Sequence, residues 1–120
     1  MILLDTDICL SILKGKIAEA DLSFIIENDV SVSSITAEEL FYAANRSSDP
    51  VGNRILAEKF LLTVRILHPD IAAMKYIADV QLSLKRHGNR YPYADIVIYS
   101  LAKTHGARLI TGNSKRYCFT

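Results

Sequence analysis

The chain begins with MILLDTD, residues 1–7, and this segment is the strongest indication of the fold. Residues 2–4 are a short, wholly apolar run, and two aspartates follow it, Asp5 and Asp7. An apolar run of this length between polar residues predicts a buried strand, typically at the centre of a parallel sheet. Ligands of open α/β folds bind outside the carboxyl ends of such strands, so Asp5 is the first candidate for chemistry.

The composition predicts an ordinary globular chain. We expect a single domain over residues 1–120, with half of its residues hydrophobic and 22% charged. No apolar run approaches the roughly 18 residues that span a bilayer. Asp5 and Asp7 interrupt the apolar stretch at the start, where a signal peptide would need it intact. We therefore expect no membrane association and a cytoplasmic location.

Charge is unevenly distributed, although the formal net charge is only +1. Residues 1–60 carry ten acidic and five basic side chains, whereas residues 61–120 carry three acidic and nine basic ones. A basic rim beside an acidic pocket would suit a ligand with a phosphate backbone. Taken alone, however, the pattern favours an ordinary solvated surface.

The two cysteines, Cys9 and Cys118, lie near opposite ends of the chain and form no metal or redox motif. We expect both to be small buried apolar residues, and the sequence leaves open whether they form a disulfide.

Strand and helix signals alternate along the chain, which predicts an α/β/α sandwich around a mostly parallel sheet. The expected strands are residues 2–4, 30–32, 64–67 and 107–111, and the expected helices are residues 8–14, 17–27, 36–46, 51–64, 71–86 and 94–105. We expect Asp7 and Asp70 to cap their helices, and Gly106 to end the last one. The inward face of the helix at 51–64 should carry its large apolar residues, Ile55, Leu56, Phe60 and Leu62.

Three acids and one amide are placed at strand ends or in early helical turns: Asp5, Glu39, Asp95 and Asn113. Each acid has a purely structural alternative. Thr36 and Glu39 fit a capping box, T-x-x-E, and Asp95 would suit the positive end of a helix dipole. Asp5 is harder to explain in this way, because an acid that ends a buried strand loses its hydration unless something pairs with it.

Several carboxylates at one sheet edge would repel one another unless they share a divalent ion. Hard oxygen ligands select Mg²⁺ or Mn²⁺, and such a site can activate water and stabilise charge on a phosphoryl group. The three histidines lack metal-ligand spacing and an apparent nucleophile partner, and the chain has no P-loop and no G-x-G-x-x-G.

Three segments carry a family resemblance: MILLDTD at the start, SSITAEEL at residues 33–40, and ADIVIYSLAKTHGARLITGN at residues 94–113. In this order and spacing they resemble the PIN domain. Within that family the chain's length is similar to the VapC group, the ribonuclease toxins of type II toxin–antitoxin pairs. The resemblance covers nearly the whole chain and implies an α/β/α sandwich with a parallel sheet.

The resemblance also implies an activity, hydrolysis of RNA phosphodiester bonds with Mg²⁺ or Mn²⁺. It implies that Asp5 and Asp95 hold the ion, that Glu39 binds it or orients the attacking water, and that Asn113 assists. Thr6 occupies the family's small-hydroxyl position, and we expect substrate contacts from four residues: Thr6, Arg90, Lys115 and Arg116. A cognate antitoxin and a homodimer are implied as well, with apolar residues of the first helices as contacts: Leu10, Ile12 and Leu13.

The chain departs from the family pattern at three places. Asn113 stands where an aspartate is common, Asp7 where an asparagine is common, and Arg116–Tyr117 where an acidic residue and Phe are common. Two alternative functions stay open. One is a PIN scaffold that binds partners with weak or absent catalysis. The other is a haloacid-dehalogenase-like phosphatase, because LLDTD resembles its D-x-D motif, although TGNSKRY lacks the acidic pair of that family.

Overall fold

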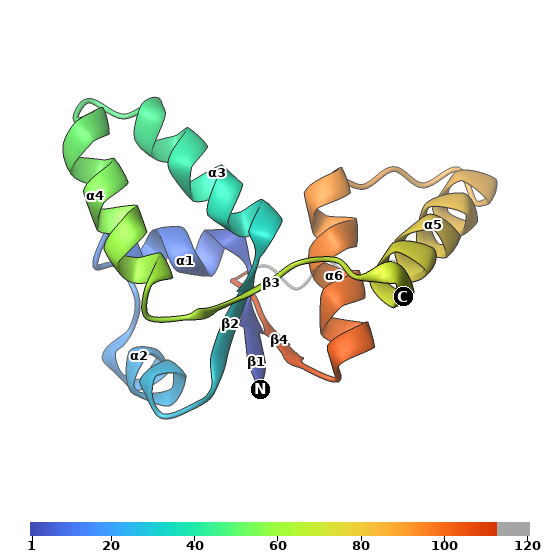
Figure 1. The fold of residues 1–120 in the computed structure, drawn as a ribbon, viewed down its shortest axis with the longest axis horizontal. Coiled ribbons are helices and arrows are strands. Elements are labelled where there is room, and N and C mark those ends of the chain that lie inside the picture. The colour runs from blue at the N-terminus through green and yellow to red at the C-terminus, as the bar shows by residue number, and fades with distance from the viewer. Residues whose placement is uncertain (113–120) are drawn as a thin grey trace.

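A four-stranded, wholly parallel sheet forms the centre of the molecule in the computed structural model, which describes residues 1–112 (Figure 1). The strands are β1 (Ile2–Leu4), β2 (Val30–Ser33), β3 (Arg65–Leu67) and β4 (Arg108–Ile110), in the order β3-β2-β1-β4. The register pairs Leu4 of β1 with Val32 of β2 and with Ile110 of β4. All four strands lie within one residue of the bounds expected from the sequence.

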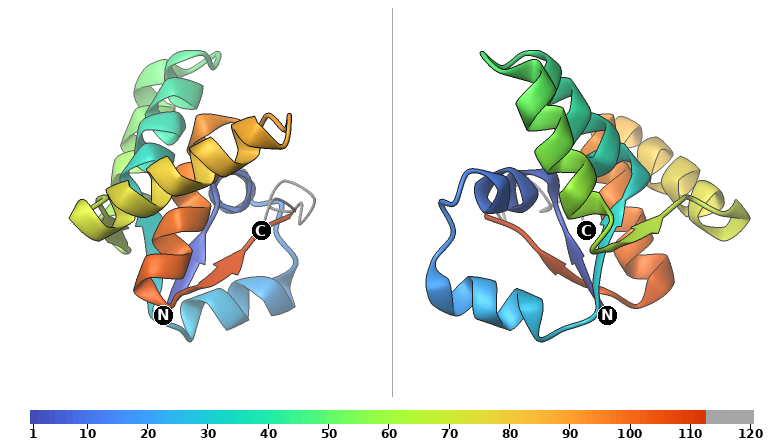
Figure 2. Two further views of the ribbon diagram at one scale, coloured as in Figure 1. Left: turned by 90° about the vertical axis from the view of Figure 1, so that its right-hand side faces the viewer. Right: turned by 60° about the vertical axis from the view of Figure 1, so that its left-hand side comes forward.

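Helices cover both faces of this sheet, which confirms the predicted α/β/α sandwich. The helices in the described part of the chain are α1 (Thr6–Leu13), α2 (Glu19–Ile26), α3 (Ser34–Asn45), α4 (Pro50–Leu61), α5 (Ile71–Arg86) and α6 (Tyr93–His105). The first four gather on one side and α5 and α6 on the other (Figures 1 and 2). Within residues 1–112 no helix is both long and apolar enough to cross a membrane.

β1 is apolar throughout because both of its faces are buried. Leu3 packs into the cluster that α5 and α6 build, whereas Ile2 and Leu4 pack into the cluster built by α1–α4. Successive side chains of a strand point to opposite faces, so one run of three apolar residues joins both cores. All three side chains are at most 4% exposed. Burial on this scale stabilises the fold by about 1.5–3 kcal/mol per side chain.

The strand order places a topological switch between β1 and β4. From β1 the chain moves outward through β2 to β3, and α5 and α6 then return it to β4 on the other side of β1. The connections therefore leave β1 and enter β4 on opposite faces of the sheet. In open α/β folds the crevice for ligands lies at such a switch, outside the carboxyl ends of the strands.

Asp5, and not Asp7, caps α1, so this part of the sequence-based prediction is wrong. The backbone of Asp5 is extended (φ −79°, ψ 173°), and its Oδ1 accepts the N–H of Ile8 at 3.0 Å. The helix follows β1 without any loop, which leaves only the residue after Leu4 in the capping position. Asp7 lies exposed in the first turn of α1.

The start of α3 also differs from the expected one. Ser33 ends β2 and caps the helix, with its hydroxyl accepting the N–H of Ile35 at 3.1 Å. Thr36 is already inside the helix, so the expected capping box with Glu39 does not form. Asp70 caps α5 and Gly106, at φ 61°, ends α6, and both assignments are confirmed.

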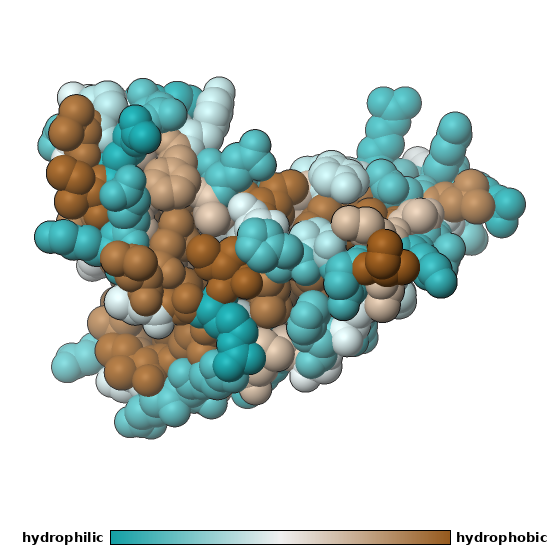
Figure 3. Space-filling view, viewed as in Figure 1, coloured by the Kyte–Doolittle hydropathy of each residue, from teal (hydrophilic) through white to brown (hydrophobic). Residues whose placement is uncertain are grey.

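The inward face of α4 was also predicted wrongly. Ile55, Leu56 and Leu62 are 47%, 50% and 86% exposed, and only Phe60 of the expected set packs against the core. The buried residues are instead Ala57 and Leu61, four apart on one stripe. Ala57 belongs to the core cluster that α1–α4 build, whereas Ile55, Leu56 and Leu62 lie on the outside. Figure 3 shows apolar side chains gathered over this part of the surface.

Candidate active site at the carboxyl edge of the sheet

Asp5 lies at the switch point, between the ends of β1 and β4. Its side chain is 1% exposed, and its backbone N–H continues the ladder to the carbonyl of Ile110 at 3.1 Å. While Oδ1 caps α1, Oδ2 accepts the hydroxyl of Thr111, the residue after β4, at 2.5 Å. The carboxylate is thus held by neutral donors from two elements, and these donors compensate part of the cost of its burial.

Glu39 reaches the same edge from α3. Its Oε1 accepts the hydroxyl of Thr6 at 2.6 Å, and Thr6 Oγ1 lies 3.1 Å from Thr36 Oγ1. Thr36 is fully buried, whereas the neighbouring Glu38 is exposed. The T-x-x-E segment therefore does not cap its own helix. It connects α3 to the first residue of α1, next to Asp5.

Asp95 is the third residue of α6 and is 3% exposed. α6 runs back across the sheet and leads through Gly106 into the amino end of β4, so its own first turn lies toward the carboxyl edge (Figure 1). The backbone N–H of Asp95 donates to the carbonyl of Pro92 at 3.0 Å. A carboxylate in this turn is stabilised by the positive end of the helix dipole.

The chemistry of these three side chains suits a hard divalent ion, since all of their donor atoms are carboxylate oxygens. In residues 1–112, however, no three acidic, histidine or cysteine side chains are arranged so that they could hold an ion. Carboxylates brought together without a cation repel one another, and Asp5 and Glu39 accept hydroxyl and amide protons instead. Each bonded oxygen keeps a further lone-pair site, so the donor set fits an ion once the side chains converge.

The remaining predicted site residues have different positions. Arg90 is exposed in the loop between α5 and α6, and Thr6 has its hydroxyl engaged with Glu39 and Thr36, which favours a positioning role for it. Three predicted residues lie outside the described residues: Asn113, Lys115 and Arg116. Sequence reasoning missed the two threonines that bond to the site, Thr36 and Thr111. Their signal is weak, since each is only a hydroxyl residue close after a strand.

Cys9 is fully buried one helical turn after Asp5, which confirms its expected role as a small core residue. Burial raises the pKa of its thiol, and the negative charge of Asp5 raises it further. Its burial and raised pKa favour the neutral thiol, which is typical of a structural cysteine. Cys118 lies outside the described residues, so the disulfide question stays open.

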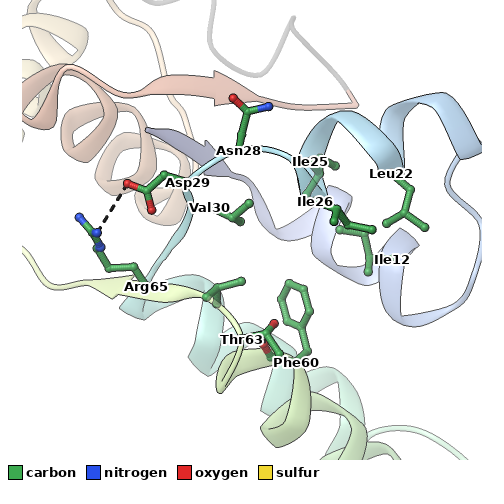
Figure 4. A pocket seen from close by; sticks show the side chains of 11 residues that line it. Ile12, Leu22, Ile25, Ile26, Asn28, Asp29, Val30, Phe60, Thr63 and Arg65 are labelled. Carbon is green, nitrogen blue, oxygen red and sulfur yellow. Dashed lines mark hydrogen bonds and ion pairs between the residues drawn. The ribbon is translucent and has the colours of Figure 1, made fainter.

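A pocket of a different character lies toward the opposite edge of the sheet (Figure 4). It has a volume of about 590 Å³ between α2, the start of β2 and the end of α4. Most of its lining is apolar and includes Ile12, Leu22, Ile26 and Phe60, while Arg65 and Asp29 form an ion pair of 3.5 Å at its rim. Such a surface suits an apolar partner and not the hydrolysis of a charged ester.

Comparison with known sequences gives consistent matches over most of the chain. The PIN domain family matches residues 2–117. The tRNA(fMet)-specific endonuclease VapC of Shigella flexneri is 29% identical over 116 residues, which cover 96% of this chain and 88% of that protein. Ribonuclease VapC2 of Haemophilus influenzae is 30% identical over 117 residues, with the same coverage of 96% and 88%.

Solved structures show the same architecture. The structure of DNA-bound VapBC from Salmonella typhimurium superposes with a TM-score of 0.88 at 28% identity, over 98% of this chain and 91% of that one. VapBC2 from Rickettsia felis, bound to a DNA fragment from its promoter, gives a TM-score of 0.87 at 25% identity, over 98% and 92%.

Proposed function

The chain belongs to the PIN domain family, and on this premise we propose that it is a metal-dependent endoribonuclease, the toxin of a toxin–antitoxin pair. The observation that supports this most strongly is the position of Asp5, a buried carboxylate at the switch point between β1 and β4. Its relatives are named as ribonucleases and as an endonuclease specific for a tRNA. A ribonuclease needs access to RNA, so the proposal includes a cytoplasmic location.

In this proposal Asp5, Glu39 and Asp95 together hold Mg²⁺ or Mn²⁺. When bound, such an ion supplies positive charge to the phosphoryl oxygens and lowers the pKa of water. Two hydrogen bonds hold the Asp5 carboxylate, so it would present its remaining lone pairs to the ion in one orientation. Glu39, held by Thr6, accepts a proton from the attacking water or orients it.

We expect charged side chains to hold the RNA. Arg90, Lys115 and Arg116 are the expected contacts, and Asn113 is expected to assist through its amide oxygen. Arginine and lysine contacts to phosphate position a strand without reading its sequence. The acids repel the same phosphates, so the cations supply the attraction that brings RNA to the edge.

The partner protein is an antitoxin, as in the VapBC pairs that the chain resembles. We assign its contact to the apolar pocket near Ile12 and Phe60, whose size and lining suit a hydrophobic segment. Leu10 and Leu13, also expected as contacts, are half-buried against the core and line a smaller pocket of about 130 Å³ between α1, α3 and α4. The expected homodimer stays a prediction, which light scattering of the purified chain tests.

Cleavage of an initiator tRNA transcript by the purified chain tests the proposal. Wild-type protein should cleave with Mg²⁺ or Mn²⁺ and should lose activity in EDTA. Asp95→Asn should remove cleavage, because a neutral amide no longer contributes charge to the ion. Asp7→Asn is the matched control, since Asp7 is also acidic and close to the edge but is exposed.

Equal cleavage by Asp95→Asn and wild type would contradict the metal site. Binding of the tRNA with no cleavage under any metal condition would favour the alternative of a PIN scaffold that binds without catalysis. Release of phosphate from monoester substrates, inhibited by beryllofluoride, would instead support the phosphatase alternative.

A further inference from the structure

We propose that the pocket at the turn between α5 and α6 is a subsite for the RNA backbone beside the cleaved phosphate; this inference rests on the proposed ribonuclease function. The pocket has a volume of about 620 Å³, within the range of small-ligand sites. Lys85, Asn89 and Arg90 supply its polar groups, and Leu84 and Ile96 supply apolar lining. None of the described residues that line it is acidic.

The location of the pocket connects it to the acidic edge. Ile96, one of its walls, directly follows Asp95 in the first turn of α6. Asp95 and one wall of the pocket therefore share the first turn of α6, and in this proposal a strand whose phosphate lies at the carboxylates continues past that turn. The sequence KRHGNR, residues 85–90, places three permanent cations and one histidine at the turn. A phosphodiester backbone carries the opposite charge, one unit per nucleotide.

The turn is closed by backbone hydrogen bonds. Gly88 lies at φ 71°, its N–H donates to the carbonyl of Lys85 at 3.1 Å, and the N–H of Asn89 donates to the carbonyl of Leu84 at 2.9 Å. This pair of bonds is a Schellman motif, which satisfies the last carbonyls of α5. Asn89 and Arg90 thus leave the helix in a fixed direction. A preformed turn loses little conformational entropy when a ligand binds, which favours a subsite over a loose charged surface.

Cations in the last turn of a helix also stabilise the helix dipole, so a structural role for Lys85 must be separated from RNA binding. The separation is experimental. Exposed cations contribute at most about 1 kcal/mol to stability, whereas phosphate contacts control the salt dependence of RNA binding.

The experiment measures binding of a fluorescein-labelled initiator tRNA transcript in EDTA, where no metal-dependent cleavage occurs, over a range of salt concentrations. Each phosphate contact contributes about 0.7–0.9 to the logarithmic salt slope. The double variant Lys85→Ala/Arg90→Ala should therefore lower the slope by about 1.5 and weaken binding roughly tenfold at physiological salt. Arg54→Ala/Lys59→Ala is the control, since it removes two exposed cations from α4 on the other side of the sheet.

Thermal unfolding serves to check that the variants are folded. The variant Lys85→Arg/Arg90→Lys should bind like wild type because it retains both charges. In Mg²⁺, the double alanine variant should raise the KM for cleavage and change kcat little. An unchanged salt slope, or an equal loss in the α4 control, overturns the subsite. If wild type fails to cleave RNA in any metal, the ribonuclease proposal fails, while the binding comparison still decides whether this pocket holds a phosphate backbone.

Discussion

Asp5 has two separable roles. Its oxygens accept hydrogen bonds that stabilise the fold, and its negative charge serves the proposed metal site. Its Oδ1 accepts the N–H of Ile8 and caps α1, and its Oδ2 accepts the hydroxyl of Thr111 after β4. Asp5→Ala removes both acceptors. Asp5→Asn keeps an oxygen for Ile8, and its amide group can donate to Thr111, whose hydroxyl rotates to accept.

The structure gives a magnitude for each variant. Loss of an N-cap side chain costs about 1 kcal/mol, and loss of a hydrogen bond to a charged acceptor costs about 1.5–3 kcal/mol. The residue is only 1% exposed, so water cannot replace either contact. We therefore expect Asp5→Ala to lower the free energy of unfolding by about 2–4 kcal/mol, and Asp5→Asn to change it by less than about 1 kcal/mol.

Urea unfolding followed by circular dichroism measures the free energy of unfolding of wild type and of both variants under the same conditions. A fixed m-value would show that the unfolded states are comparable. An Asp5→Ala variant as stable as wild type would contradict this prediction, since the cap would then contribute nothing. An Asp5→Asn variant that loses as much stability as Asp5→Ala would contradict it too, since charge and not hydrogen bonding would then stabilise the edge.

Three further predictions concern single residues. Ser100→Ala should raise the free energy of unfolding by about 1 kcal/mol, because its buried hydroxyl has no hydrogen-bond partner among the described residues; a loss in urea unfolding would reveal a partner. Gly106→Ala should lower that free energy by about 1 kcal/mol through its φ of 61° alone, since a Cβ there meets nothing within 4 Å; an unchanged unfolding midpoint would contradict this. Cys9 should resist Ellman's reagent in folded Cys118→Ser protein but react in urea. Because burial raises its pKa, its contribution to stability is complete below about pH 8.5, where the unfolded thiol is neutral, and is lost as the pH rises further. Equal labelling of the folded and unfolded protein would contradict the burial of the Cys9 thiol.

β1 was predictable because its burial on both faces requires a continuous apolar run. The sequence marks residues 2–4 for this reason, and the bounds of all four strands were within one residue of those observed. α5 was predicted with its cap because Asp70 precedes a regular amphipathic pattern that ends before Gly88. Local sequence is sufficient to predict a helix cap where only one nearby residue can serve as that cap.

The predictions of the helix cap and of the inward helix face were wrong where tertiary structure determines these features. Asp5 and Asp7 are equally good caps by type, and only the end of β1 selects Asp5. The inward position of Ala57 depends on how closely α4 approaches α3, which no property of α4 alone determines. Large side chains such as Leu62 therefore lie outside, although their hydrophobicity favours burial.

The candidate site shows the same limit. The sequence identifies Asp5, Glu39 and Asp95 by their places after strands and in early helical turns. It could not predict the hydrogen bond from Thr6 to Glu39, which joins residues 33 apart, or the bond from Thr111 to Asp5, which joins residues 106 apart. These contacts form only after the sheet assembles, because parallel strands place their carboxyl ends side by side.

Calorimetric titration of Mn²⁺ into wild type and Asp5→Asn tests whether the three acids at the carboxyl edge form one divalent-metal site. Asp5→Asn retains the hydrogen-bonding capacity of this position and removes one charge, so any loss reports on the ion and not on the fold. We expect saturable binding of Mn²⁺ to wild type and a loss of at least about tenfold in affinity for the variant, which corresponds to about 1.4 kcal/mol. Equal affinity of the two proteins for Mn²⁺ would contradict the metal site.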